Sequence, residues 1–385
     1  MKIIHGSVYT ENNGFVQKDI EIRGRYIAAD SAENKIQGNE KDKDECIIDA
    51  ADCYVIPGLT DVHLHGCAGY DFCDGTIEAM KAIAGYQASV GVTTIFPATM
   101  TLPEEVLLKV CRTAREYAHR QQAGPQALLC GINLEGPFVS KEKLGAQNAA
   151  FLQEPNQKLF DRLQEESGGL IRMVDIAPEL PGAMEFMKEN SGQAVISLAH
   201  TAADYDTAMA AFEAGATHVT HLFNAMNGFS HRQPGVIGAA ADAGAYAELI
   251  CDGVHIHPAA VRSALKLLGE DRIIFISDSM MATGLSDGDY SLGGQPVKVV
   301  GRIAALADGT IAGSVTNLME GMRRAVLEMQ IPLEIAVKCA AVNPAKHMGI
   351  YEKYGSIEPG KVANLVLLEK ESLEVKRVII RGIAL

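Results

Sequence analysis

The stretch YVIPGLTDVHLH, residues Tyr54–His65, gives the strongest indication of the fold of this chain. It is an apolar run that closes on His63 and His65, two residues apart. Side chains alternate between the faces of a strand, so these imidazoles are expected to point the same way. Together they can bind one divalent metal, although an isolated His-x-His is more often two polar residues bonded to backbone or water. The rest of the chain favours the metal.

Seven more apolar runs follow the first, and helical stretches separate them. Each run is short and rich in Val, Ile or Leu, as parallel strands buried on both faces require. Residues 103–121, 204–214 and 258–268 are examples of the intervening helices. Eight strands alternating with helices predict a (β/α)8 TIM-like barrel, with a doubly wound open sheet as the structural alternative. The predicted strands end near His65, Ala98, Glu135, Ala177, His200, Leu222, Cys251 and Asp278.

Both ends of the chain are rich in predicted β-strands. The first segment has a hairpin pattern around the turn Glu11-Asn12-Asn13-Gly14, and the last segment contains two further apolar runs. We therefore expect one small β domain assembled from residues 1–54 and 355–385. The barrel occupies residues 55–354 in this division.

The bulk composition excludes several classes of partner. The chain has 385 residues, 48% of them hydrophobic, and a formal net charge of -14, which argues against nucleic acid and anionic membrane surfaces. No run approaches the length of a transmembrane helix, and the N-terminus lacks a signal-peptide pattern. The eight cysteines form no Cys-x-x-Cys pair, so we expect free thiols in a reducing compartment, the cytoplasm.

Metal-binding residue types collect at the predicted carboxyl ends of the strands, where barrels of this type form their active sites. Each residue has an ordinary structural explanation, such as a helix N-cap, but all of them are expected to lie around the same open end of the barrel, its mouth. Imidazole and carboxylate are suitable ligands for zinc, iron or manganese. His218 falls on the opposite strand face from His221, so we expect His218 to be a structural residue facing the helix layer. The residues that converge are His63, His65, Glu135, His200, His221, Asp252, His255 and Asp278.

These ligands imply a hydrolytic chemistry. A bound metal lowers the pKa of its water to about 7 and polarises the carbonyl under attack. A neighbouring carboxylate takes the proton and later delivers it to the leaving group. Asp278, which follows the eighth predicted strand, is the candidate for that carboxylate. The sequence therefore predicts hydrolysis of an amide, ester or amidine.

Several segments resemble the N-acetylglucosamine-6-phosphate deacetylases of the amidohydrolase superfamily, and the resemblance covers nearly the whole chain. It implies the same barrel joined to a small β-sandwich domain formed by both chain termini. The segments that carry it are PGLTDVHLHG (57–66), LEGPF (134–138), LGAQ (144–147), THLFNAM (220–226), HRQPG (231–235), DGVH (252–255) and DSM (278–280).

The resemblance also implies roles for individual residues. Glu135, His200 and His221 match the ligands of the catalytic metal, and His63 with His65 adds a possible second metal site. Asp278 matches the general acid/base in hydrolysis of N-acetylglucosamine 6-phosphate to glucosamine 6-phosphate and acetate by metal-bound hydroxide. The neighbouring subunit of an implied homodimer contributes Arg232 to the phosphate site. The implied substrate-binding positions are Ala146, Gln147, Asn224, Ala225, Arg232, His255, Ile311, Ala312 and Gly313.

Several alternatives stay open at this point. The nearest is the same reaction on N-acetylgalactosamine 6-phosphate, which differs at one hydroxyl centre. A cyclic-amide hydrolase is disfavoured because many of those use a carbamylated Lys on the fourth strand, which here ends Asp175-Ile176-Ala177-Pro178. A non-catalytic sugar-phosphate sensor is disfavoured because no expected ligand or base is missing. The ligand types accept zinc, iron, manganese or cobalt, as one ion or two.

Overall fold

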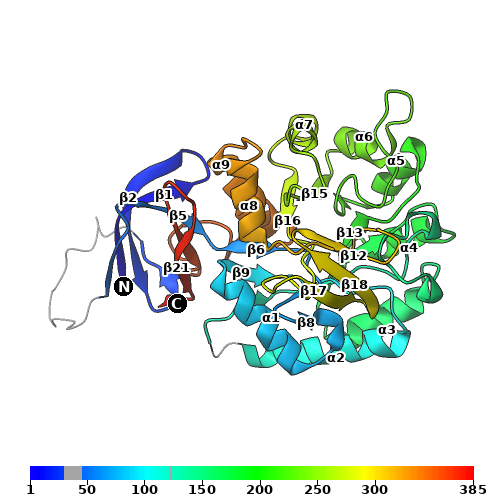
Figure 1. Ribbon diagram of the computed structural model, residues 1–385, viewed down its shortest axis with the longest axis horizontal. Helices are drawn as coiled ribbons and strands as arrows, with labels where there is room; N and C mark the ends of the chain where they lie inside the picture. The colour runs from blue at the N-terminus through cyan, green and yellow to red at the C-terminus, as the bar shows by residue number, and fades with distance from the viewer. Residues whose placement is uncertain (30–45, 122–123) are drawn as a thin grey trace.

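Eight parallel strands follow one another around the larger part of the molecule (Figure 1). The computed structural model describes residues 1–29, 46–121 and 124–385. Almost every residue of the eight strands is buried, as expected for strands covered on both faces. They are β6 (Leu59–Asp61), β9 (Val92–Ile95), β11 (Ile132–Leu134), β12 (Ile171–Ile176), β13 (Val195–Leu198), β14 (His218–Val219), β15 (Tyr246–Ile250) and β16 (Ile273–Ile276).

Hydrogen bonds just beyond the strand ends close these strands into a barrel. The runs β10-β9-β6, with β10 at Leu128–Leu129, and β11 to β16 form two parallel sheets. Thr99 N–H donates to the carbonyl of Asn133 at 2.9 Å and joins them on one side. Asp278 N–H donates to the carbonyl of His63 at 2.9 Å and joins them on the other. The predicted barrel is therefore confirmed.

Helices surround the barrel, and the three predicted ones lie within two residues of their expected limits. An apolar cluster that includes Val62, Phe96, Ile274 and Met348 fills the interior. No described helix combines the length and the hydrophobicity needed to cross a bilayer. The α-helices are α1 (Ile77–Ser89), α2 (Glu104–Arg120), α3 (Gln157–Ser167), α4 (Ala183–Asn190), α5 (Tyr205–Glu213), α6 (Gly235–Ala243), α7 (Pro258–Leu268), α8 (Leu318–Leu327), α9 (Leu333–Val337) and α10 (Asn343–His347).

Shorter elements connect these layers. After β16, the antiparallel strands β17 (Gly288–Leu292), β18 (Gln295–Val300) and β19 (Ile303–Ala305) form a separate sheet. Three 3-10 turns and one π-helical turn complete the inventory of helical segments in the described ranges. With the two-stranded pair, these elements are β7 (Gly66–Cys67), β8 (Tyr70–Asp71), η1 (Phe72–Asp74), η3 (Lys141–Lys143), η4 (Ala149–Phe151) and η5 (Lys338–Val342).

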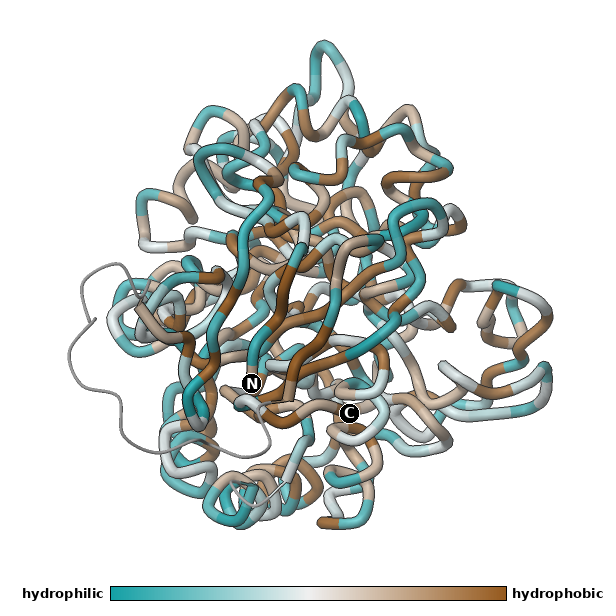
Figure 2. The backbone as a smooth tube through the Cα atoms, turned by 90° about the vertical axis from the view of Figure 1, so that its left-hand side faces the viewer, coloured by the Kyte–Doolittle hydropathy of each residue, from teal (hydrophilic) through white to brown (hydrophobic). Residues whose placement is uncertain are grey.

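Strands from both termini share one sheet beside the barrel, which confirms the small β domain. Its strands follow one hydrogen-bonded path, β22-β21-β20-β5-β1-β2-β3, with β4 against β1. Figure 2 faces this domain and shows the strands side by side. The domain limits given above stay predictions. The strands are β1 (Lys2–Thr10), β2 (Gly14–Arg23), β3 (Tyr26–Ile27), β4 (Ile47–Asp49), β5 (Cys53–Pro57), β20 (Leu365–Glu369), β21 (Val375–Ile380) and β22 (Ile383–Ala384).

Candidate active site

The backbone at the barrel mouth adopts strained conformations. His200, His221 and Asp278 have φ angles of 43°, 31° and 49°, in the left-handed region that non-glycine residues rarely occupy. Each such residue costs about 1–3 kcal/mol, so surrounding structure has to hold it there. Each of the three comes shortly after the end of a strand in the sequence: His200 after β13, His221 after β14 and Asp278 after β16. The strained residues therefore lie where the strands end and where their side chains enter the barrel mouth.

Glu135, His200 and His221 form one group of potential metal ligands. Nε2 of His200 lies 3.0 Å from Oε1 of Glu135, and Nε2 of His221 lies 3.3 Å from the same oxygen. The two Nε2 atoms are 3.2 Å apart. Nδ1 of His200 contacts the carbonyl of Lys143 at 2.9 Å, which leaves Nε2 facing the other ligands. All three ligand atoms lie within 4.8 Å of one another.

His63 and His65 form a second group with the other oxygen of the same glutamate. Nε2 of His65 lies 3.2 Å from Oε2 of Glu135, and Nε2 of His63 lies 3.7 Å from it. The two imidazoles therefore face the same point. Nε2 of His63 and Oε2 of Glu135 are buried and have no hydrogen-bond partner. Such atoms are costly to bury, and a divalent ion would satisfy them, so the residues present fit one or two metals.

The electrostatics of the site also fit a metal. Burial alone would raise the pKa of Glu135, but His63 and His65 hold it well below its usual range. Burial alone would lower the pKa of His65, but Glu135 and Asp278 raise it to about 10. Because ligating imidazoles must be neutral, a bound metal would replace their protons. The site thus has the negative charge needed to attract a cation.

Asp278 lies beside both groups without belonging to either. Its Oδ1 is 3.3 Å from Nε2 of His65 and 3.8 Å from Nε2 of His63. Burial alone would raise the pKa of Asp278. The hydrogen bond from His65 and the charges of nearby imidazoles outweigh burial and lower this pKa below its ordinary value, so the carboxyl is ionised. An ionised carboxylate next to the metal groups can accept a proton from an attacking water molecule.

A cavity of about 270 Å³ opens onto these side chains. It includes seven of the predicted substrate-binding positions, but Ala312 and Arg232 of the same chain are not among its lining residues. Met100, Leu292 and Thr310 also line it and lie outside every segment quoted for the resemblance, whereas Gly145, a further lining residue, lies within LGAQ (144–147). The predicted positions that line the cavity are Ala146, Gln147, Asn224, Ala225, His255, Ile311 and Gly313.

Gln147 and His255 are both held by neighbours within this cavity. Thr101 N–H donates to Oε1 of Gln147 at 2.7 Å, and Nε2 of Gln147 contacts Sδ of Met100 at 3.7 Å, which leaves the second N–H of the amide to donate elsewhere. Nδ1 of His255 contacts Oδ2 of Asp252 at 2.7 Å. Burial lowers the pKa of His255, but the bond to Asp252 raises it above its ordinary value. His255 therefore gains positive character, which suits an anionic ligand.

The prediction that His218 faces the helix layer is wrong. Its Nε2 lies 3.1 Å from Oε1 of Glu248, whose other oxygen contacts Nδ1 of His63 at 3.1 Å, so His218 points into the barrel. The alternation rule fails because β14 ends at Val219 and His221 has left the strand conformation. Sequence reasoning also missed Glu248, although a charge within the apolar run AELI (247–250) was a visible signal.

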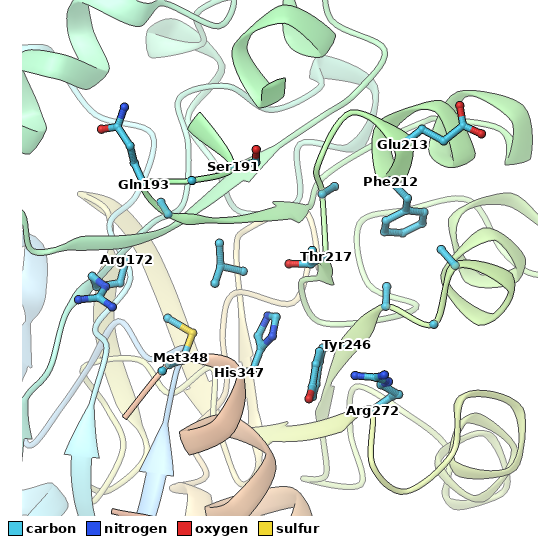
Figure 3. Close-up of a pocket in the computed structure, with 18 of the residues that line it drawn as sticks. Arg172, Ser191, Gln193, Phe212, Glu213, Thr217, Tyr246, Arg272, His347 and Met348 are labelled. Atoms are coloured by element: carbon cyan, nitrogen blue, oxygen red, sulfur yellow. The ribbon is translucent and has the colours of Figure 1, made fainter. Parts of the chain in front are cut away.

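A larger cavity of about 730 Å³ lies at the opposite end of the barrel (Figure 3). It is lined by residues at or before the amino ends of strands, among them Val195, Thr217, Tyr246 and Arg272, and by His347. None of the predicted metal ligands lines it. Because barrel enzymes use the carboxyl ends of their strands, the smaller cavity is the candidate active site.

Comparison with known proteins agrees with this geometry. Residues 54–384 match the amidohydrolase family model. An N-acetylglucosamine-6-phosphate deacetylase from Bacillus subtilis is 37% identical over 98% of this chain and 94% of its own length. An N-acetylgalactosamine-6-phosphate deacetylase from Escherichia coli O157:H7 is 35% identical over 85% of this chain and 86% of its own.

A solved structure gives the same result. A mutant N-acetyl-D-glucosamine-6-phosphate deacetylase from Mycobacterium smegmatis, in complex with N-acetyl-D-glucosamine-6-phosphate, aligns with a TM-score of 0.89. The two chains are 32% identical, and the alignment covers 100% of this chain and 98% of the other. The chain belongs to the amidohydrolase family, and within it to the N-acetylglucosamine-6-phosphate deacetylases.

Proposed function

We propose that this enzyme hydrolyses N-acetylglucosamine 6-phosphate to glucosamine 6-phosphate and acetate. The observation that carries the proposal is the meeting of two metal-ligand groups, which share Glu135, with the ionised Asp278 in one cavity. The family relationship over the whole chain directs the choice of substrate. A sensor that only binds would not need a base in this position.

The five residues of the two ligand groups would bind the metal. Glu135, His200 and His221 would hold one divalent ion, and His63 with His65 offers a place for another beside the second oxygen of Glu135. We propose zinc, iron, manganese or cobalt, all of which accept imidazole and carboxylate ligands. When bound, the metal would act as a Lewis acid and lower the pKa of a water molecule to about 7.

The protein side chains handle the proton and the oxyanion. Asp278 takes a proton from the attacking water and later delivers it to the departing amine nitrogen of glucosamine 6-phosphate. The amide nitrogen of Gln147 donates a hydrogen bond to the acetyl oxygen, and the bond from Thr101 fixes the orientation of that amide. An amide brings no charge, so we expect the contribution of Gln147 to oxyanion stabilisation to be modest.

We propose that the substrate phosphate is bound at a homodimer interface. The residues that line the cavity within one described chain include no Lys or Arg. Asn224, Ala225 and His255 line it, and Arg232 of the neighbouring subunit would complete the site. Arg232 is exposed, close to the exposed Phe229, so its guanidinium is free to reach another chain. Guanidinium offers paired donors in a fixed fork that matches phosphate.

We also propose that the protein works in the cytoplasm. All eight cysteines are free. Free thiols of this number are typical of a reducing compartment.

The test is acetate release from N-acetylglucosamine 6-phosphate by protein of known metal content, before and after chelation. We expect release that chelation abolishes and added metal restores. Absence of acetate release by metal-loaded protein would refute the proposal. A mixture of Arg232→Ala subunits with Asp278→Asn subunits tests the dimer, because an active site formed between the two would regain one intact set of residues.

N-acetylgalactosamine 6-phosphate is the second candidate substrate. The relative from Escherichia coli O157:H7, at 35% identity, carries that name. The ratio of kcat/KM for the two epimers, measured on the same protein preparation, distinguishes them. A larger kcat/KM for the galactosamine epimer would replace the first candidate with the second.

A further inference from the structure

A buried carboxylate lies directly behind the His63 side of the site. Glu248 is 0% exposed and sits in the middle of β15. Its Oε2 contacts Nδ1 of His63 at 3.1 Å and accepts the backbone N–H of His221 at 3.0 Å. Its Oε1 lies 3.1 Å from Nε2 of His218. An acidic side chain with no access to water is expensive unless neighbours satisfy it. Here His63 and the backbone N–H of His221 satisfy Oε2, while Oε1 has the charge contact with His218 and no hydrogen bond.

The contact with Glu248 determines which nitrogen of His63 is free. An ionised carboxylate only accepts hydrogen bonds, so Nδ1 of His63 has to carry the proton. In the neutral imidazole that a bound metal requires, Nε2 then carries the lone pair and faces Glu135, where it has no hydrogen-bond partner. In metal sites, a carboxylate on the far nitrogen commonly fixes both the tautomer and the ring orientation of a ligating histidine. Glu248 is in that position.

Stacked rings lie on the side of the Glu248 carboxylate away from His63. His218, which contacts it, stacks on His347 with ring centres 4.8 Å apart and an interplanar angle of 14°. His347 stacks in turn on Tyr246 at 4.1 Å. Figure 3 shows His347 beside Tyr246 among the residues that line the larger cavity. A column of packed rings thus limits the movement of Glu248 away from His63.

We propose that Glu248 is a positioning residue that makes His63 a metal ligand, so that it determines whether the His63–His65 position is filled. The proposal rests on the proposed function only for the use of that metal, because occupancy is measured without substrate. The backbone bond to His221 ties the same carboxylate to the other ligand group. Glu248 itself does not line the cavity that would hold the substrate.

Two variants separate the geometry of Glu248 from its charge. Glu248→Gln keeps the side-chain length, and its oxygen can still accept from His63 and His221. Glu248→Asp keeps the charge but is one methylene shorter and withdraws from His63. Asp175→Asn is the matched control, since Asp175 is also 0% exposed inside the barrel and bonds Thr220, outside both ligand groups.

The measurement is the number of zinc ions per chain, by elemental analysis, during dialysis against a series of chelator-buffered zinc concentrations. We expect two ions for the unmodified protein. Glu248→Asp should bind one of them about 10–100-fold more weakly, the range found when such supporting partners are removed. Glu248→Gln should stay within about threefold of the unmodified protein, as should Asp175→Asn.

Three results would overturn the proposal. The first is that the unmodified protein binds only one zinc ion. The second is that Glu248→Asp binds both ions with unchanged affinity. The third is that either Glu248→Gln or Asp175→Asn loses as much zinc affinity as Glu248→Asp. A protein that binds two ions but releases no acetate would refute the proposed reaction and leave the role of Glu248 intact.

Discussion

Replacing Asp278 with asparagine removes one negative charge at the barrel mouth and keeps the size of the side chain. Asp278 belongs to neither ligand group, so the metal content should not change. The asparagine amide cannot accept the proton that Asp278 would take from water. Losing one acid/base group typically lowers the rate by about 10²–10⁴-fold. At 1.36 kcal/mol for each factor of ten, the barrier should rise by ~3–5 kcal/mol.

The assay is kcat for acetate release with the zinc content of each preparation measured alongside. KM should change far less than kcat, because the Asp278 carboxylate acts on the proton and not on the sugar phosphate. Asp271→Asn is the matched control, since it changes an exposed aspartate near the other end of the same strand, β16. Turnover within a few-fold of the unmodified enzyme, at unchanged zinc content, would refute Asp278 as the acid/base.

Three further predictions concern stability. The free energy of unfolding, measured by calorimetry, should be about 2.7 kcal/mol higher with zinc at 100 times its Kd than in the chelated protein. Equal free energies of unfolding would show that the two ligand groups do not form a metal site. Gly136→Ala should lower the free energy of unfolding by at least about 1–3 kcal/mol, because φ is 74° and the added Cβ would lie 2.2 Å from Oγ1 of Thr101. Gly85→Ala, where the Cβ meets nothing within 4 Å, is the control in the same denaturant titration. The raised pKa of His255 contributes stability that is complete below its ordinary value of 6.5 and is lost as pH rises through the raised value. The stability difference between the unmodified protein and His255→Asn should therefore shrink above pH 6.5, and a difference independent of pH would exclude the Asp252 pair as its source.

Much of the fold could be predicted from the sequence because strand and helix leave different periodic signals. Buried parallel strands read as short apolar runs, and the residue that follows each run lies at the barrel mouth. This rule alone places His200, His221 and Asp278 at one end of the barrel. It works because the carboxyl ends of all eight strands share that end, whatever the exact register.

The parts that the sequence did not predict depend on contacts between strands. The side on which His218 points could not be predicted because β14 contains only two residues, too few for alternation to be reliable. Glu248 lies within the predicted strand that ends near Cys251, and its partner His63 is 185 positions away in the sequence. Only the closed barrel brings those two residues to hydrogen-bonding distance.

The left-handed backbone at His200, His221 and Asp278 has a consequence for protein engineering. Glycine would relieve about 1–3 kcal/mol of strain at each position, and asparagine part of it. Variants selected for thermal resistance alone should therefore accumulate substitutions at these positions and lose turnover as they gain stability. A thermostable form of this enzyme will need selection on activity at every round.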